Sequence, residues 1–326
     1  MSRSFTPPRL ILVDGFAGTG KSTTAQRLWL HLTHSGHDAA WWHEHQAGHP
    51  IFSYAEVEEL LDVRPEAFEE RLRTAWTGLA RHTAAPITVL EGSFFQVTVG
   101  VLLAMNVAPR RIERLLLDID RTVAPLGAAL VHLFYEDTRR GLLAIREHRG
   151  AYWLDGMTSI VGKSPYGRRH RVRDVEGLIA FYRAQRAIID AVFPALSMRR
   201  TAIEISGGRW NGYLRRARAF LRIGTPARET PLTPRRLLRH AGQYRGKAGA
   251  RVIATDGSRL YLHDGLLAPQ PLVPARDGSF EVESLPIAIR FTSGAGGVSQ
   301  RLSVHNQLLN AQPARASFSR KAPSSR

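Results

Sequence analysis

The 326-residue sequence contains no cysteine, so disulfides, thiolate catalysis and cysteine-ligated zinc or iron–sulfur sites are excluded. It also lacks an apolar run of the roughly 18 residues that a membrane-spanning helix needs. The longest such run, residues 97–108, has 12 residues and contains Asn106. The apolar run at residues 10–13 is too short for a signal peptide and is followed by Asp14. From these absences we expect a soluble, cytoplasmic protein.

Acidic side chains are scarce beyond residue 100. Residues 1–100 carry 8 basic and 11 acidic side chains, whereas the rest of the chain carries 37 basic and 17 acidic ones, a net charge of +20. Only four of the basic residues are lysine, and arginine binds phosphates and carboxylates through two parallel hydrogen bonds. The composition therefore favours anionic ligands. The alternative, a solvated arginine surface that reflects a GC-rich genome, stays open.

Short apolar runs alternate with segments of helical periodicity over residues 1–222. The runs typical of buried parallel strands are residues 10–14, 37–42, 87–90, 128–135 and 201–205. Helices are predicted at residues 22–32, 55–82, 94–105, 109–123, 138–148, 175–193 and 210–221. Residues 150–173 are polar, glycine-containing and basic, and we expect them to form a loop or lid. The alternation predicts a three-layer α/β domain, a five-stranded parallel sheet covered by helices on both faces.

A different pattern begins at residue 223. Residues 223–234 contain three prolines and are expected to be a linker. In residues 235–310 the helical period is nearly absent, and the turn signal Asp-Gly occurs three times. We therefore predict that the domain of residues 1–222 is followed by a small antiparallel all-β domain over residues 235–310. Residues 311–326 are expected to form a disordered tail.

One glycine-rich segment fits the pattern G-x-x-x-x-G-K-[ST] at every fixed position. It consists of Gly15, Phe16, Ala17, Gly18, Thr19, Gly20, Lys21 and Ser22, and Thr23 follows it. An apolar strand precedes the segment and a helix follows, which is the context of a phosphate-binding loop. Glycines let successive backbone N–H groups point at phosphate oxygens, and the helix start adds partial positive charge. The segment therefore predicts binding of a nucleoside triphosphate.

Two side chains of this segment suit a triphosphate with Mg²⁺. Lys21 can reach the β- and γ-phosphates, and the Ser22 hydroxyl can ligate Mg²⁺. None of the four lysines follows an asparagine, so the Asn-Lys-x-Asp motif with which GTPases read guanine is absent. We therefore expect ATP and Mg²⁺ as cofactors, with residues 15–23 as the binding segment.

Residues 8–222 resemble the P-loop kinase superfamily, which has the P-loop nucleoside triphosphate hydrolase fold, and within it the thymidylate kinase-like branch. The resemblance rests on the glycine-rich segment with Thr23 after Ser22, on the strand count and on three further segments. In the first of these, Glu44 follows the second strand, with a proline nearby. Family members place an acid here that faces the phosphoryl acceptor, which implies that Glu44 contacts or deprotonates the acceptor hydroxyl. A solvated loop carboxylate is the alternative.

The second segment is the end of the third strand, at Glu91. An acid at the carboxyl end of a strand beside the loop is well placed to hold Mg²⁺, directly or through water. The family has an arginine after this acid and often a glutamine that meets the acceptor; this chain has Gly92 and Gln96. The glycine departs from the family pattern and leaves the acceptor open. We predict Ser22 and Glu91 as metal ligands, and Glu44 and Gln96 as acceptor-binding residues.

The third segment is basic and follows the fourth strand. It contains Arg139, Arg140, Arg146 and Arg149. In related kinases a lid at this place closes over the phosphates, and its arginines stabilise the charge that spreads onto the transferred phosphoryl group. The resemblance implies this role for Arg146 and Arg149, which share a helix face. A solvated basic helix is the alternative. The predicted catalytic residues are Lys21, Glu44, Glu91, Arg146 and Arg149.

The sequence thus predicts an enzyme, an ATP-dependent kinase-like phosphotransferase that moves the γ-phosphoryl group to a nucleotide or another small hydroxylated acceptor. A regulatory ATPase or nucleotide switch that acts through the β domain or a partner protein is the alternative. The basic charge also suggests nucleic-acid binding, although we find no motif for it. The C-terminal region resembles the small β-barrel modules appended to some bacterial enzymes and carries no catalytic signature.

Overall fold

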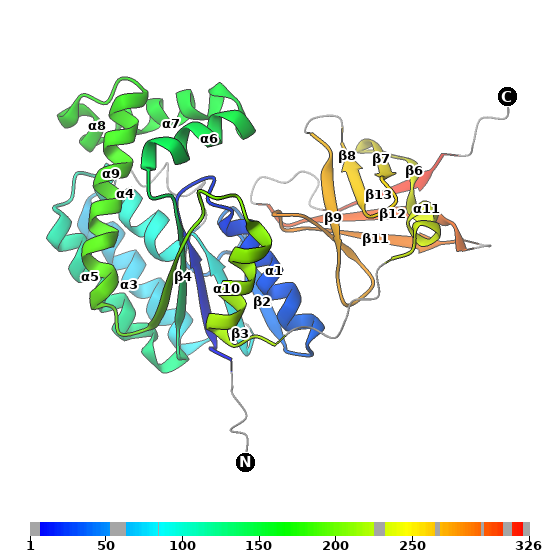
Figure 1. Ribbon diagram of the computed structural model, residues 1–326, viewed down its shortest axis with the longest axis horizontal. Coiled ribbons are helices and arrows are strands. Elements are labelled where there is room, and N and C mark those ends of the chain that lie inside the picture. The colour runs from blue at the N-terminus through cyan, green and yellow to red at the C-terminus, as the bar shows by residue number, and fades with distance from the viewer. Residues whose placement is uncertain are drawn as a thin grey trace, which may run out of the picture. The chain divides into compact units, whose positions relative to one another are not determined.

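Figure 1 shows the computed structural model of the chain. It describes residues 7–52, 63–83, 85–224, 232–264, 268–294, 297–308 and 315–321 and, at residues 148 and 149, the backbone alone. The chain divides into two compact units. Most of residues 1–224 form the first unit, and Thr225–Arg326 together with the short segments Leu30–Gly36 and His45–Ala47 form the second.

Five parallel strands form the sheet of the first unit, in the order β2-β3-β1-β4-β5. The strands are β1 (Leu10–Asp14), β2 (Ala39–Trp42), β3 (Ile87–Glu91), β4 (Ala129–Phe134) and β5 (Arg199–Glu204). Every residue of β1 and β3 is buried, which explains their almost uninterrupted apolar sequences. The pairs Val13–Glu91 and Asp14–His132 bring the carboxyl ends of three strands to one edge of the sheet. The predicted five-stranded parallel sheet is confirmed.

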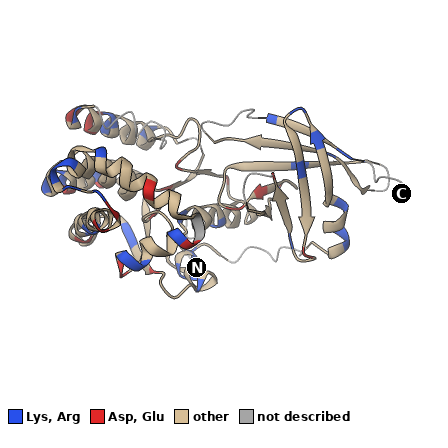
Figure 2. Ribbon diagram, turned by 90° about the horizontal axis from the view of Figure 1, so that it is seen from above, with Lys and Arg blue, Asp and Glu red and all other residues tan. Residues whose placement is uncertain are grey.

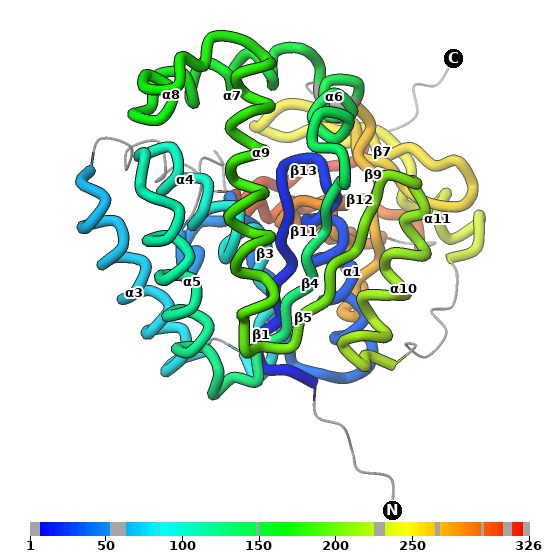
Figure 3. Tube along the Cα trace, turned by 60° about the vertical axis from the view of Figure 1, so that its left-hand side comes forward, coloured from blue at the N-terminus to red at the C-terminus, as the bar shows by residue number. Residues whose placement is uncertain are grey.

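Helices cover both faces of this sheet. They are α1 (Lys21–His34), α3 (Pro65–Arg81), α4 (Thr98–Ala104), α5 (Pro109–Val123), α6 (Thr138–Arg149), α7 (Ala151–Lys163), α8 (Pro165–His170), α9 (Val175–Val192) and α10 (Trp210–Leu221). In Figures 1 and 3, α1 and α10 lie on one face and α3, α4, α5 and α9 on the other. This arrangement is the predicted three-layer α/β architecture. None of the described helices has the length and apolar character needed to cross a bilayer.

Residues 150–173 differ from the prediction, because most of them are helical and not a loop. The Ser164 hydroxyl accepts a hydrogen bond from the Gly167 N–H (3.1 Å) and so caps α8, whose first turn contains Pro165. Gly167 lies so close to α7 that a Cβ there would be 1.9 Å from the Val161 carbonyl oxygen. The glycines that indicated a loop therefore permit two short helices to pack closely.

Two further helix predictions are only partly matched. The predicted helix of residues 55–82 corresponds to α3, which begins at Pro65, and residues 53–62 lie outside the described part of the chain. The predicted helix of residues 94–105 begins as a short π-helix, Ser93–Val97, and continues as α4. The sequence pattern located this segment but did not predict its change of helical pitch.

The second unit contains a closed antiparallel barrel of eight strands. Its elements are α11 (Pro234–His240), β6 (Gly242–Gly246), β7 (Gly249–Thr255), β8 (Leu260–His263), β9 (Gln270–Pro274), β10 (Phe280–Val282), β11 (Ile287–Ser293), β12 (Ser299–Asn306) and β13 (Arg315–Arg320). Alternate residues of these strands point inward and, with Leu237 of α11, form a separate apolar core. The predicted small antiparallel β domain is confirmed.

The strand β13 corrects one prediction. It lies within residues 311–326, which we expected to be a disordered tail, and it closes the barrel by pairing with both β12 and β6. Phe318 is buried in the barrel core, and Arg320 donates a hydrogen bond to the carbonyl oxygen of Arg239 (3.0 Å). A single large apolar residue among serines and arginines was too weak a signal for a strand, although barrel closure requires one there. The rest of the predicted tail, apart from Lys321, lies outside the described residues.

Candidate functional site

The glycine-rich segment, which we call the glycine loop (residues 15–22), joins the carboxyl end of β1 to the first turn of α1. Gly18 and Gly20 have φ angles of 77° and 74°, in the left-handed region that favours glycine. The Thr19 backbone N–H and hydroxyl both donate to the Phe16 carbonyl oxygen, at 3.3 and 2.8 Å, and hold the loop in a tight curl. A curled backbone at a helix start is the arrangement that binds anions.

Lys21 is held by a carboxylate inside the site. Its Nζ lies 3.1 Å from Oε2 of Glu44, and the two side chains are only 4% and 11% exposed. The sequence analysis predicted both residues as functional but did not predict that they meet. Separating an ion pair so poorly exposed to water leaves a charge that needs a new partner.

Glu91 lies beside this pair at the end of β3. Its Oε1 accepts a hydrogen bond from the Ser22 hydroxyl at 3.0 Å and lies 3.4 Å from the backbone nitrogen of Glu44 and 3.4 Å from Nε2 of His43. Burial, followed by the nearby charge of Glu44, raises the pKa of Glu91 well above its usual value. The structure therefore brings together Ser22 and Glu91, the two residues predicted to hold a metal ion.

Gly92 explains the departure from the family pattern. Its φ angle is 64°, and a Cβ at this position would lie 2.6 Å from Oε2 of Glu44 and 3.1 Å from Cε of Lys21. A side chain at residue 92 would therefore collide with the ion pair. The Glu44 carboxylate fills the space into which an arginine side chain at residue 92 would extend.

Gln96 also faces this cluster. Its Oε1 lies 3.5 Å from the position that a Cβ of Gly92 would take. The carbonyl oxygen of Gln96 accepts a hydrogen bond from the Gln185 side chain at 3.4 Å, which ties the segment to α9. The predicted residues Lys21, Glu44 and Gln96 therefore line one small volume at the carboxyl ends of β1 and β3.

Asp14 is a buried residue of the site that the sequence analysis did not select. Its carboxylate accepts four backbone hydrogen bonds, from the N–H groups of Gly15 (2.8 Å), Phe94 (2.9 Å), Phe95 (2.8 Å) and Gln96 (3.0 Å). Burial raises the pKa of Asp14 to about 6, although the hydrogen bonds act in the opposite direction. One carboxylate therefore joins the start of the glycine loop to the segment that carries Gln96. An acid that ends a buried strand was the available signal.

Helix α6 contacts the glycine loop through an apolar residue. A Cβ at Gly18 would lie 2.3 Å from Cγ1 of Ile145, so Ile145 packs directly on the loop. The predicted lid residue Arg146 follows it in α6 and is exposed, while the side chain of Arg149 lies outside the described part of the structure. Arg139 pairs with Glu176, with Nη1 donating to Oε1 at 2.6 Å. The predicted catalytic role of Arg146 and Arg149 stays a prediction.

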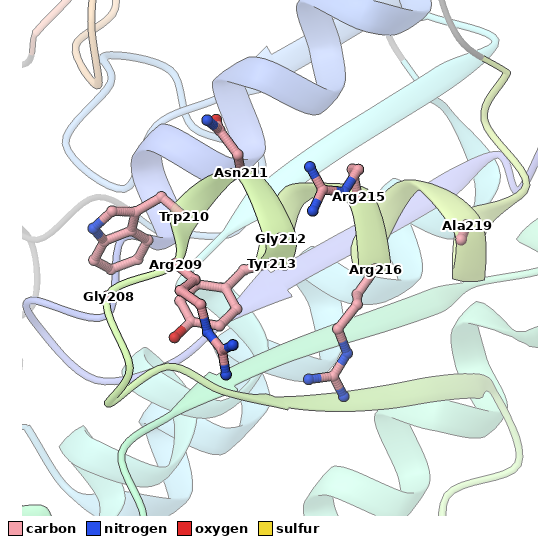
Figure 4. Close-up of a pocket in the computed structure, with 9 residues that line it drawn as sticks. All are labelled: Gly208, Arg209, Trp210, Asn211, Gly212, Tyr213, Arg215, Arg216 and Ala219. Carbon is pink, nitrogen blue, oxygen red and sulfur yellow. The ribbon is translucent and has the colours of Figure 1, made fainter.

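A pocket along α10 was also missed (Figure 4). Trp210 begins α10 and is 48% exposed, and its ring lies 2.7 Å from the position of a Cβ at Gly20. The pocket, with a volume of about 800 Å³, is lined by Gly208, Arg209, Trp210, Asn211, Gly212, Tyr213, Arg215, Arg216 and Ala219. Its signal in the sequence was an aromatic residue that closely follows the fifth strand, because the carboxyl ends of parallel strands surround ligand sites.

Comparison with known proteins gives little beyond this geometry. No family model and no curated protein matches the chain. Among solved structures the chain is similar to the YorR protein of Bacillus subtilis, solved in complex with phosphorylated GDP, with 14% sequence identity and a TM-score of 0.34. The match covers 65% of this chain and 94% of the YorR chain. So distant a likeness carries no functional assignment, which has to come from the site itself.

Proposed function

We propose that the first unit binds a nucleoside triphosphate, ATP with Mg²⁺, at the glycine loop. The observation that carries the proposal is the convergence of Lys21, Ser22 and Glu91 where the curled loop enters α1. The loop amides and the helix start would surround the phosphate oxygens, and the Lys21 ammonium would bind the β- and γ-phosphates. This is the P-loop arrangement that the sequence resemblance implies.

The oxygen atoms around Ser22 fit a Mg²⁺ ion. Mg²⁺ prefers oxygen ligands and is usually held by one or two carboxylates together with substrate phosphates and water. Glu91 Oε2 is buried and has no hydrogen-bond partner among the described residues, and Ser22 Oγ lies next to the same carboxylate. When bound, Mg²⁺ supplies positive charge that neutralises the phosphates and favours the ionised form of Glu91.

The reaction that we propose is transfer of the γ-phosphoryl group to a hydroxyl group. The acceptor oxygen forms a bond to the γ-phosphorus, the bond to the β–γ bridging oxygen breaks, and ADP leaves. Glu44 takes the hydroxyl proton, and Gln96 positions the acceptor beside it. Glu44 is released for this role when the triphosphate replaces it at Lys21. Catalysis comes mainly from positioning and electrostatic stabilisation.

The pocket beside Trp210 is where we place the base and sugar of the nucleotide. One residue that lines the pocket, Trp210, contacts Gly20 of the glycine loop. A partly exposed tryptophan offers a flat apolar surface against which an aromatic base stacks, with a gain of about 1–3 kcal/mol. Trp210→Ala should therefore weaken ATP binding more than it weakens binding of inorganic triphosphate.

The test combines binding with a search for the acceptor. Calorimetry with Mg-ATP and Mg-GTP should give millimolar or tighter binding to the wild type and none to Lys21→Ala. Lys163→Ala, which removes an exposed lysine of α7, is the matched control and should bind normally. Nucleoside monophosphates, nucleosides and small hydroxylated compounds are then screened for ATP-dependent phosphorylation.

The outcomes of the screen separate the two candidate functions. ATP consumption that requires one acceptor supports the phosphotransferase. Slow hydrolysis that no acceptor stimulates supports the regulatory ATPase instead. Folded wild-type protein that ignores both nucleotides at millimolar concentration would refute the proposal.

A further inference from the structure

The outer face of the barrel carries an unusual row of side chains across β12, β13 and β6. Arg301 pairs with Ser319, and Ser319 pairs with Arg245. Directly paired residues of antiparallel strands have their side chains on the same face of the sheet. The neighbouring residues Leu302 and Phe318 are buried in the barrel core, so the two arginines and the serine between them point outward.

The next two rows continue this pattern. Ser303 pairs with Ser317 on β13 and with Arg290 on β11, and His305 pairs with Arg315. Arg290, Arg301, Arg315 and Arg245 are all exposed. We call this surface of β11, β12, β13 and β6 the arginine face. Its serines are small, so the guanidinium groups stand above their surroundings.

The arginine face has four exposed arginines and is bordered by two acidic residues, Asp277 and Glu281. Among the described residues, Arg290 forms an ion pair with Asp277, whereas Arg245, Arg301 and Arg315 form none. Residues 232–321 contain 13 basic and 5 acidic side chains, and Figure 2 shows the blue basic residues spread over the barrel strands and α11. Guanidinium groups that have no ion-pair partner and lie this close together create a positive potential that attracts a polyanion.

The face is hollowed at one side. A hollow of about 670 Å³ is lined by Asp277, Ser279, Glu281, Ala288, Arg290, Ser303, Val304, His305, Gln307, Arg315, Ala316 and Ser317. Hydroxyl, amide and guanidinium donors dominate its polar lining, and Asp277 is already paired with Arg290. Burial raises the pKa of Glu281 to about 7, so its negative charge is partly lost near neutral pH. The arginines and serine hydroxyls of the hollow can donate hydrogen bonds to phosphate oxygens.

We propose that the arginine face binds the phosphate backbone of duplex nucleic acid. Arg301 and Arg245 are two strand spacings apart, about 10 Å, so the face can contact several phosphates at once. Proteins that hold single strands stack the bases on aromatic side chains. The rows of the arginine face contain no aromatic residue other than His305, which favours backbone contacts to a duplex over base stacking. Such contacts are independent of sequence.

The proposal predicts a specific salt dependence. Four phosphate contacts give a slope of log K against log[salt] of about −3.6 for B-form DNA, so that affinity falls about a hundredfold between 50 and 200 mM KCl. The double variant Arg245→Glu/Arg301→Glu should bring this slope to about −2 and weaken binding at 50 mM KCl at least tenfold. The substituted side chains are exposed, and the barrel core is unchanged.

The experiment measures fluorescence anisotropy of a labelled DNA duplex of about 20 base pairs with the full-length protein. The control Arg235→Glu/Arg259→Glu makes the same change in net charge at exposed residues of α11 and the β7–β8 turn, off the arginine face. It should weaken binding less than about threefold, because charges away from the contact are screened. A duplex RNA of equal length should give a similar result, since the contacts are to phosphates.

Several outcomes would overturn the proposal. One is that the control variant loses as much affinity for the duplex as the test variant does. Another is that the wild type does not bind the duplex at low salt. A third is that the wild type binds vesicles of anionic lipid more tightly than it binds the duplex. Lys21→Ala should bind the duplex as the wild type does; loss of binding in this variant would place the contact in the first unit and contradict the proposal. Because no nucleotide is present, failure here leaves the proposed phosphotransferase untouched.

Discussion

Replacing Glu44 with glutamine should tighten the binding of Mg-ATP, although Glu44 lies in the proposed active site. In the structure the Lys21 ammonium already has an anionic partner, the Glu44 carboxylate at 3.1 Å. A triphosphate that binds the glycine loop has to displace this carboxylate from Lys21. Glutamine has almost the same shape but no charge, so it competes much less for the ammonium.

The size of the effect follows from the distance. Two unit charges 3.1 Å apart attract by about 5 kcal/mol at an effective dielectric constant of 20, and by about 1.3 kcal/mol in bulk water. The phosphate restores a partner to Lys21, so only a part of this energy opposes binding. The displaced Glu44 also repels the phosphates. We therefore expect Glu44→Gln to lower the dissociation constant of Mg-ATP about tenfold or more, at least 1.4 kcal/mol.

Isothermal titration calorimetry at low ionic strength measures this change directly. Glu70→Gln, an exposed position of α3, removes the same charge from the surface and should leave the affinity unchanged within about twofold. The same Glu44→Gln variant should lose acceptor-dependent phosphoryl transfer, because an amide cannot take the acceptor proton. Unchanged or weaker binding of Mg-ATP to a folded Glu44→Gln variant would refute the idea that Glu44 competes with phosphate.

Three further predictions concern stability. Gly92→Ala should lower the free energy of unfolding in a urea titration by about 1–2 kcal/mol, because the φ angle of 64° suits glycine and the new Cβ meets Glu44. The control Gly78→Ala in α3 has open space around it and should be neutral or stabilising in the same titration. Burial raises the pKa of Asp14 from 3.8 to about 6, so the folded state holds the Asp14 proton more tightly than the unfolded state does. The free energy of unfolding should therefore fall by up to about 3 kcal/mol as the pH rises from 4 to 6. The free energy of unfolding of the Asp14→Asn variant should not show this decrease between pH 4 and pH 6. Phe318→Ala should destabilise the barrel by about 3–5 kcal/mol, seen as an earlier unfolding transition of the second unit, and an unchanged transition would contradict the closing role of β13.

The sequence predicted the parts of the site that depend on short-range patterns. The glycine loop could be found because its residues are consecutive and its flanking strand and helix have clear periodicity. Glu91 could be found because it ends an apolar strand. The glycine loop follows β1 and Glu91 ends β3, and these two strands are neighbours in the parallel sheet. The pairing of Val13 with Glu91 therefore brings Glu91 close to the start of the loop.

The features that escaped prediction depend on contacts between distant segments. No local pattern indicates that Glu44 reaches Lys21, or that Gly92 leaves room for it, because both follow from how loops fold over the sheet edge. The helices α7 and α8 escaped because glycine suggests a loop, whereas Gly167 serves close helix packing. The strand β13 escaped because its only large apolar side chain is that of Phe318, and its place follows from closure of the barrel.

Asp14 shows how the fold links the two halves of the proposed reaction. Its carboxylate accepts the N–H groups of Gly15, at the start of the loop that would bind the donor, and of Gln96, beside the proposed acceptor. A hydrogen bond to an ionised, buried acceptor is stronger than one to a neutral acceptor. The donor and acceptor segments therefore cannot shift independently without leaving a buried carboxylate unpaired, a cost of several kcal/mol. A transfer reaction that depends on positioning needs such a fixed relation between its two substrates. The fold supplies it at the one edge of the sheet where β1 and β3 end side by side.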